Sequence, residues 1–220
     1  MKVVRENGLS LTLFALFGVS LFGQFMAGWY HYNDEQQLHK QPLVTAVEYL
    51  GEGHFWEALF ENWESEFLQM GAYVLLTVFL FQKGSVDSKR IDAKERVDRV
   101  LPKRLQPKDA PWPVLKGGFV LKLYENSLSL ALMLLFAGSF IMHGIAGAVA
   151  YNNEQTEHGG EQLSTLEFME SSTFGFESFQ NWQSEFLSIG VLVVLSIFLR
   201  QKGSPESKPV DAPHSETGGG

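Results

Sequence analysis

Four apolar blocks in this 220-residue chain are too long to be the core helices of an ordinary soluble domain. They cover residues 9–29, 67–81, 128–150 and 186–199 and contain few formal charges. A helix needs about 20 apolar residues to cross a bilayer, where only regular structure can satisfy its backbone polar groups. The sequence therefore predicts an all-α membrane protein with four transmembrane helices.

An internal repeat narrows the architecture further. The segment 62–68, Asn-Trp-Glu-Ser-Glu-Phe-Leu, returns with one change at 181–187, which is 119 residues later. At this offset residues 6–89 align with 125–208 without gaps, and 36 of the 84 positions are identical. We interpret the chain as two parallel copies of a two-crossing unit, related by an axis along the membrane normal. Because the first apolar block recurs in mid-chain, it is not read as a cleaved signal peptide.

The repeat also sets the predicted organisation. Residues 1–89 form the first repeat, with crossings at about 8–30 and 62–82, and residues 120–208 form the second, with crossings at about 127–150 and 181–200. The first crossings extend beyond the membrane as far as His39 and His158, and interfacial helices over 44–60 and 163–179 lie on the outer side. A charged, proline-rich linker spans 90–119, with a short helix first and an extended part after it, and a disordered tail spans 209–220.

The basic residues predict the orientation of the chain. Sixteen of the 17 Lys and Arg residues lie in 1–6, 82–125 and 200–220, whereas the connections 31–66 and 151–185 hold only Lys40. Basic flanks stay on the cytoplasmic side, so both termini and the linker are expected inside. The two outer connections carry eight and seven carboxylates, and this anionic surface argues against a nucleic-acid partner. The lipid bilayer is the expected partner.

Small and polar residues mark the helix ends and faces. Asn7 and Asn126 are expected to cap the N-termini of the first crossings, and Gly84 and Gly203 to end the second crossings in the left-handed conformation. Two pairs of small residues, Gly23 with Ala27 and Gly144 with Ala148, predict close helix packing. Gln24 and His143 are polar residues at membrane depth and are expected to face the bundle interior, while Trp63 and Trp182 are expected to anchor the helices at the headgroups.

Helical spacing collects the remaining polar residues into a candidate outer vestibule. One group follows each first crossing and another begins each second crossing, and both groups occur in both copies. The predicted members are Glu35, His39, Asn62, Ser65 and Glu66 in the first copy and Glu154, His158, Asn181, Ser184 and Glu185 in the second.

These residues support three functional hypotheses. A non-catalytic envelope scaffold or sensor is favoured, because the chain shows no nucleophile constellation, phosphate loop or cofactor fingerprint, and no cofactor is expected. The second hypothesis is a pathway for an ion or small solute, which would require a homodimer, because four crossings rarely enclose a pore. The third is a metal-binding membrane enzyme that uses the pairs Glu35/His39 and Glu154/His158. The chain has no cysteine, so thiolate metal sites and disulfides are excluded.

The repeated motifs also carry a resemblance. They are Glu-Asn-x-Leu-Ser, Tyr-Asn-x-Glu-Gln, Asn-Trp-x-Ser-Glu-Phe-Leu and Gln-Lys-Gly-Ser, and together they span nearly the whole chain. With them the chain resembles a family of bacterial inner-membrane proteins known only as a domain of unknown function. The resemblance implies a bacterial plasma membrane and a duplicated two-helix unit, and it brings no catalytic residues.

Overall fold

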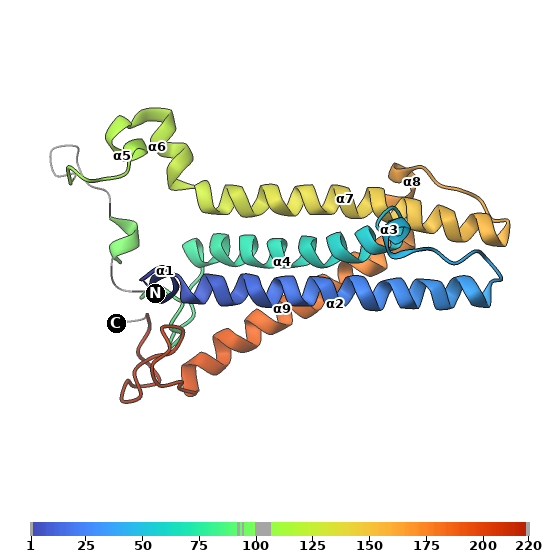
Figure 1. The fold of residues 1–220 in the computed structure, drawn as a ribbon. Helices are drawn as coiled ribbons and strands as arrows, with labels where there is room; N and C mark the ends of the chain where they lie inside the picture. The colour runs from blue at the N-terminus through green and yellow to red at the C-terminus, as the bar shows by residue number, and fades with distance from the viewer. Residues whose placement is uncertain (1, 92, 94, 100–106, 219–220) are drawn as a thin grey trace. The chain divides into compact units, whose positions relative to one another are not determined.

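A computed structural model describes residues 2–91, 93, 95–99 and 107–218 of the chain, apart from the side chains of Glu157 and His158. Every regular element in these ranges is helical, and Figure 1 shows their order along the chain. The all-α class expected from the apolar blocks is therefore confirmed for this part of the protein.

Three helices in each half of the chain, two long and one short, occur at matching positions. The long helices are α2 (Gly8–Leu38) and α4 (Gly53–Phe79) in the first half, and α7 (Ser127–His158) and α9 (Ser172–Phe198) in the second. The short helices are α3 (Ala46–Tyr49) and α8 (Thr165–Met169). Each helix of the second half begins 119 residues after its counterpart, the offset of the sequence repeat.

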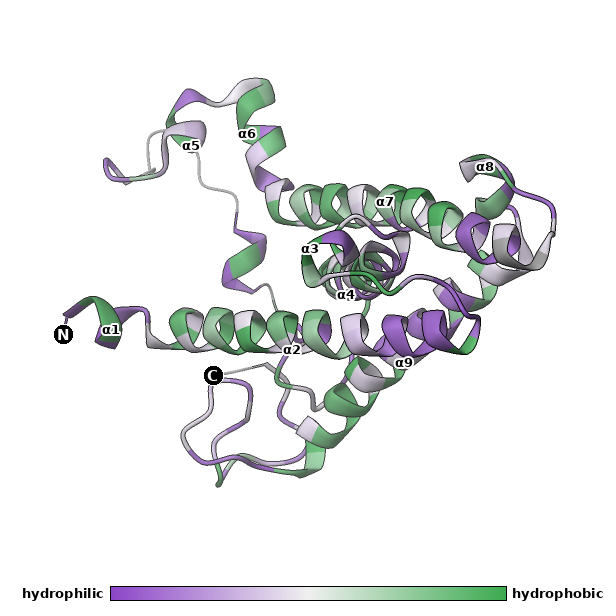
Figure 2. Ribbon diagram, turned by 45° about the vertical axis from the view of Figure 1, so that its right-hand side comes forward, coloured by the Kyte–Doolittle hydropathy of each residue, from purple (hydrophilic) through white to green (hydrophobic). Residues whose placement is uncertain are grey.

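Three of the long helices are long and apolar enough to cross a membrane, namely α2, α7 over Ser127–Thr156, and α9. None of the residues of α2 is buried, and large side chains such as Phe14, Val19 and Phe22 are exposed along it. Figure 2 shows α2 as hydrophobic over most of its length and hydrophilic at its C-terminal end. Such a surface requires lipid rather than water around it, which indicates a membrane protein.

Helix α4 is not among these three, because four glutamates lie between Glu57 and Glu66 in its first half. The helix also begins earlier than expected. The sequence predicted an interfacial helix over 44–60 and a new helix near Asn62, whereas the chain forms the four-residue α3 and then one continuous helix from Gly53. A boundary at Asn62 is wrong because 53–62 contains no proline or helix-ending glycine to interrupt the hydrogen-bond ladder. The counterpart α9 likewise begins at Ser172, well before Asn181.

The two asparagines expected to cap the first crossings act on the preceding helices instead. Asn7 Nδ2 donates to Val3 O at the end of α1 (Lys2–Glu6), and Asn126 Nδ2 donates to Lys122 O at the end of α6 (Gly118–Glu125). The N-cap prediction is wrong for Asn7, whose side chain makes no cap hydrogen bond to α2. Both asparagines follow another helix, and their amide groups donate to its carbonyls, which have no partner within that helix.

The linker and tail contain more structure than the sequence indicated. A 3₁₀ turn, η1 (Arg96–Asp98), and the helix α5 (Trp112–Lys116) precede α6, so the second half of the linker is not extended throughout. Gly84 and Gly203 do have positive φ, but they lie in turns beyond α4 and α9, which end at Phe79 and Phe198. In the tail, the buried Lys208 Nζ donates to the carbonyls of Pro213, His214 and Glu216 at 3.0–3.2 Å, a defined course that differs from the expected disorder.

The chain divides into two compact units that cut across the repeat. One unit contains residues 1–60 and 141–174, and the other contains residues 61–140 and 175–220. The first unit holds α2, α3, α8 and the ends of α4 and α7 that adjoin them. Much of the buried aromatic and polar structure of the protein lies in it, including Tyr49, Phe55, His143, Phe168 and Phe174.

Candidate functional site

Two segments of the first unit carry the clearest polar geometry of the protein. We name residues 31–55 the first cap segment and residues 150–174 the second cap segment. In each, the chain leaves a long helix, forms a short helix and enters the next long helix. Each position of one corresponds to the position 119 residues away in the other.

One asparagine holds the loop of each cap segment to the helix that precedes it. Asn33 Oδ1 accepts from Val44 N at 2.8 Å, and Asn33 Nδ2 donates to Val44 O at 2.9 Å. Asn152 makes the same two bonds with Leu163, at 2.8 and 2.7 Å. We call this pair of bonds the asparagine clamp. It satisfies both backbone groups of a loop residue at once, which a purely apolar contact could not do.

A capping box starts the short helix in both segments. In α3, Thr45 N donates to Glu48 Oε2 at 2.7 Å, and Glu48 N donates to Thr45 Oγ1 at 3.3 Å. In α8, Ser164 and Glu167 form the same reciprocal pair at 2.8 and 3.3 Å. These bonds hold the pKa of both glutamates below its ordinary value; the largest cause is the backbone N–H of Thr45 for Glu48 and the hydroxyl of Ser164 for Glu167.

A glycine on each long helix receives the aromatic ring of the short helix. A Cβ at Gly28 would collide with the hydroxyl of Tyr49, and a Cβ at Gly147 would lie 2.5 Å from Phe168 Cε1. Both rings are almost fully buried. Close packing therefore occurs at these glycines, whereas the expected pair Gly23 and Ala27 is exposed. In the second copy the expectation is met within this unit, because Gly144 contacts Met169 and Ala148 is buried.

In the first cap segment the buried ring is a tyrosine, and it leads to a cluster of ionisable side chains. His31 and Glu35 lie one turn apart on α2, with Nε2 and Oε1 at 3.4 Å, and His54 is the second residue of α4. One potential ligand atom from each of the three lies within 4.8 Å of the others. His31 and Glu35 are exposed and His54 is half-buried, so the cluster opens to the surface.

The tyrosine hydroxyl fixes one of these imidazoles. Tyr49 Oη and His54 Nδ1 are 2.8 Å apart, and the two rings lie 5.9 Å from each other. Burial, and then the negative charge of Glu35, raises the pKa of Tyr49 to about 12. Burial is also the main effect on His54, whose pKa is lowered; Glu35 opposes this shift and His31 adds to it. Both Tyr49 and His54 are therefore held neutral at neutral pH.

The second cap segment has no equivalent of this cluster, because its aligned residues are apolar or neutral. Ala150 replaces His31, Thr173 replaces His54 and Phe168 replaces Tyr49, and only Glu154 keeps the ionisable group of Glu35. Phe168 packs instead on Phe174, at 5.7 Å between ring centroids. The buried ring of His143 lies 4.6 Å from Phe174, so this predicted intramembrane polar residue packs on an aromatic ring inside the first unit. Its counterpart Gln24 is half-buried.

The predicted vestibule residues are divided between the two compact units. Glu35, His39 and Glu154 belong to the first unit, and Asn62, Ser65, Glu66, Asn181, Ser184 and Glu185 belong to the second. The side chain of His158 lies outside the described residues. A common vestibule therefore stays a prediction. Of the proposed metal pairs, Glu35 lies in a group of potential ligands with His31 and His54, and this group does not include His39, the C-cap residue of α2.

Within the second unit, the paired serines bond to their own helices. Ser65 Oγ donates to Asn62 O at 2.9 Å, and Ser184 Oγ donates to Asn181 O at 2.8 Å. In such bonds the hydroxyl group donates its hydrogen to a backbone carbonyl of the preceding turn, so its donor is satisfied without a ligand. The presence of a serine at this position in both copies is therefore explained by a hydrogen bond within its own helix.

A polar contact joins α4 and α9 in the second unit. Asn181 Nδ2 donates to Glu61 Oε1, and Trp182 Nε1 donates at 3.2 Å to Oε1 of the fully buried Glu64. The indole of Trp182 also lies 5.4 Å from Phe179, and Trp63 lies 6.5 Å from Phe67. The headgroup anchoring of both tryptophans stays a prediction, while Trp182 has the additional role of satisfying a buried carboxylate.

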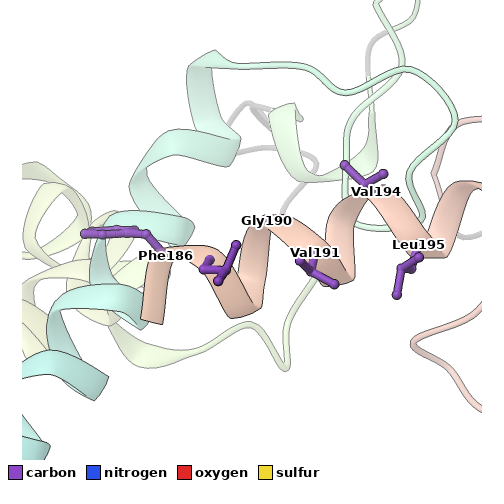
Figure 3. A pocket seen from close by; sticks show the side chains of 6 residues that line it. Phe186, Gly190, Val191, Val194 and Leu195 are labelled. Carbon is purple, nitrogen blue, oxygen red and sulfur yellow. The ribbon is translucent and has the colours of Figure 1, made fainter. Parts of the chain in front are cut away.

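An open apolar hollow of about 350 Å³ follows one face of α9. Its lining residues all come from this helix: Phe186, Leu187, Gly190, Val191, Val194 and Leu195. Figure 3 labels five of them, all except Leu187. A hollow without polar groups suits a lipid acyl chain and offers no chemistry to a substrate.

The residues that the sequence analysis missed are His31, Tyr49 and His54. The repeat directed attention to positions that are identical in both copies, and these three differ between the copies. The i, i+4 spacing of His31 and Glu35 was a usable signal. The approach of His54 was not, because the start of α4 at Gly53 was not foreseen.

Comparison with known proteins identifies a family. A family model described as a domain of unknown function, DUF6766, matches residues 1–219. No curated protein matches the chain, and no solved structure matches it.

Proposed function

The chain belongs to the DUF6766 family, and on that premise we propose that it is a multi-pass protein of the bacterial inner membrane that serves as a non-catalytic scaffold or sensor. The coarse part of this proposal rests on the three apolar helices.

The proposed topology has four crossings in two parallel copies, with both termini in the cytoplasm. Helix α4 is the fourth crossing, because it matches α9 in length and in its starting position, 119 residues earlier. Its apolar part follows Glu66, which leaves the glutamates at the outer end. The basic residues at 82–125 and 200–220 support the cytoplasmic placement of the linker and the tail.

The non-catalytic role rests on one observation: several of the polar residues that the two copies share are bonded within their own segments. The asparagine clamps, the capping boxes and the serines Ser65 and Ser184 all bond to nearby backbone. A catalytic site requires polar groups directed at a substrate, with a base or nucleophile in reach. Here the duplicated polar groups build two similar caps, which suits a protein whose outer surface is recognised by a partner.

The topology can be tested with single cysteines, because the chain has none of its own. Leu43→Cys and Leu166→Cys place exposed thiols in the two cap segments, and Val97→Cys and Val210→Cys place them in the linker and the tail. An impermeant maleimide added to intact cells should label the first two, and the other two only after lysis. Labelling of Val97→Cys or Val210→Cys in intact cells would contradict the proposed orientation.

The role is tested by flux and by crosslinking. Proteoliposomes containing the protein should pass cations, anions and small solutes no faster than empty vesicles. Flux that Glu66→Gln and Glu185→Gln abolish would instead support a solute pathway. A photo-crosslinking residue at Leu43 or Leu166 should give an adduct of discrete mass in cells, and the absence of any adduct from both sites and from Val97 would contradict a scaffold.

A further inference from the structure

We propose that the first cap segment binds one divalent transition-metal ion of the Zn²⁺ class through His31, Glu35 and His54. This inference goes beyond the proposed function, because it assigns a ligand and a site that a scaffold does not require. The described residues of the second cap segment do not repeat this group of ligands.

The spacing of the three side chains fits one ion. Ligand atoms of a tetrahedral zinc site, with bonds of about 2.0–2.1 Å, lie about 3.3–3.4 Å apart. His31 Nε2 and Glu35 Oε1 are already 3.4 Å apart. The ligand atom of His54 lies within 4.8 Å of both, so a side-chain shift of at most about 1.4 Å brings it to the spacing of a tetrahedral site.

The identity of the ligands selects the class of metal. Two imidazoles and one carboxylate are typical of zinc sites with three protein ligands and an open fourth position. Ca²⁺ and Mg²⁺ prefer oxygen ligands alone and would lose two of the three groups. The open position is available here, because His31 and Glu35 are exposed to solvent.

Tyr49 holds the imidazole of His54 in position for metal binding. Its hydroxyl lies 2.8 Å from His54 Nδ1. When Nδ1–H donates to this oxygen, the lone pair of Nε2 is left for the metal and the ring orientation is fixed. The tyrosine itself is immobilised, because it is 1% exposed and its ring lies against Gly28.

The alternative reading is an ordinary ion pair on the surface of a helix. Pairs at i, i+4 such as His31 and Glu35 are common and contribute little to stability. Two features go beyond such a pair. A third ligand comes from a different helix, and a buried hydroxyl holds that third ligand in place.

The test is equilibrium dialysis of the full-length protein in detergent micelles against Zn²⁺, with bound metal measured by elemental analysis. We expect one ion per chain, and a loss of at least about tenfold in affinity for His31→Ala and for His54→Ala. His39→Ala is the matched control, because it removes the other histidine one turn from Glu35, and it should retain the ion. Tyr49→Phe, which inserts the residue found in the second cap segment, should weaken binding by about 10–100-fold with the fold intact.

A gain-of-site variant adds a positive result, a rise in bound metal, that a loss of folding cannot imitate. Ala150→His combined with Phe168→Tyr and Thr173→His rebuilds the cluster around Glu154 and should raise the stoichiometry from one to two. The proposal is overturned if the folded wild-type protein, verified by its circular dichroism, binds no Zn²⁺. It is equally overturned if the His31 and His54 variants bind as the wild type does, or if only His39→Ala loses the ion. None of these readouts depends on topology, flux or crosslinking.

Discussion

In the first cap segment a tyrosine fills the space beside the helix glycine, and in the second a phenylalanine does so. Around this position the two segments share the asparagine clamp, the capping box and the residue at which the short helix begins. They differ in the groups around the ring, which are His31 and His54 in one case and Ala150 and Thr173 in the other.

We call the asparagine clamp and the capping box, which both segments share, the repeated frame. The difference shows that the same frame can hold a cluster of ionisable groups in one copy and not in the other. The buried ring supplies the packing energy in both segments, since Tyr and Phe differ by one hydroxyl. That hydroxyl requires a partner when it is buried, and His54 provides it. Once an imidazole lies there, a second histidine and a glutamate on the adjacent helix complete a polar cluster.

The largest expected effect is the loss of unfolding free energy when the Phe168 ring of the second cap segment is removed. Phe168 is fully buried, so Phe168→Ala leaves a cavity and should cost about 3–5 kcal/mol of unfolding free energy. Leu166→Ala on the same helix is the control; its side chain is 67% exposed and the change should stay within about 0.5 kcal/mol. Reversible denaturation in detergent micelles measures both. Equal costs for the two variants would show that α8 does not pack on α7 as described.

The next largest effect is expected when an asparagine clamp is removed. It tests whether the clamp contributes equally to stability in the two segments. Asn33→Ala and Asn152→Ala each remove two hydrogen bonds of about 0.5–1.5 kcal/mol, so each should cost about 1–3 kcal/mol. Asp34→Ala, an exposed neighbour, serves as the control. A large loss in one copy and none in the other, measured in the same denaturation assay, would break the equivalence.

The sequence predicted the shared frame better than the differences. Apolar periodicity and the constant offset were sufficient for the long helices and for their extension to Leu38. The start of α4 at Gly53 was missed, because aromatic residues between glutamates suit an interfacial segment as well as a continuing helix. Asn33 and Glu48 were visible as repeated polar residues, but their partners depend on a loop path that helical spacing does not encode.

The candidate site was predicted only in part. Glu35 was singled out from its helix face, and the structure groups it with His31, one turn before it, and with His54 of α4 rather than with the expected His39. His54 reaches it from another helix, and such a long-range approach leaves no periodic signal in a single sequence. The roles of Asn181 and Trp182 toward Glu61 and Glu64 were hidden for the same reason.

A smaller effect of opposite sign is expected where the first helix of each copy ends. Lys40 has a φ of 58°, and its counterpart Gly159 has a φ of 67°. The left-handed conformation destabilises a residue with a side chain by about 1–2 kcal/mol. Glycine avoids this cost, but it loses about 0.5–1 kcal/mol more conformational entropy on folding. Lys40→Gly should therefore stabilise the protein by about 0.5–1 kcal/mol. Gly159→Lys should have the reverse effect, and a loss of stability in Lys40→Gly would contradict the shared helix ending.

The smallest expected effect is a pH dependence that both capping boxes should share. The pKa of Glu48 and of Glu167 is lowered in the folded protein by hydrogen bonds that require the ionised carboxylate. A carboxyl group with a depressed folded pKa contributes stability above its unfolded pKa, and that contribution is lost as pH falls through the folded pKa. The start of α3 and of α8 should therefore fray together below pH 4.5, the ordinary value for glutamate.

Amide exchange at Glu48 and Glu167, corrected for the intrinsic pH dependence, measures this fraying. Glu48→Gln keeps a hydrogen-bond acceptor but cannot titrate, so protection at α3 should become independent of pH while α8 continues to respond. Glu167→Gln should give the mirror result. Because each box is closed by residues three apart in its own segment, neither variant should alter the other segment. A response of α8 to Glu48→Gln would mean that the two frames are coupled and not merely alike.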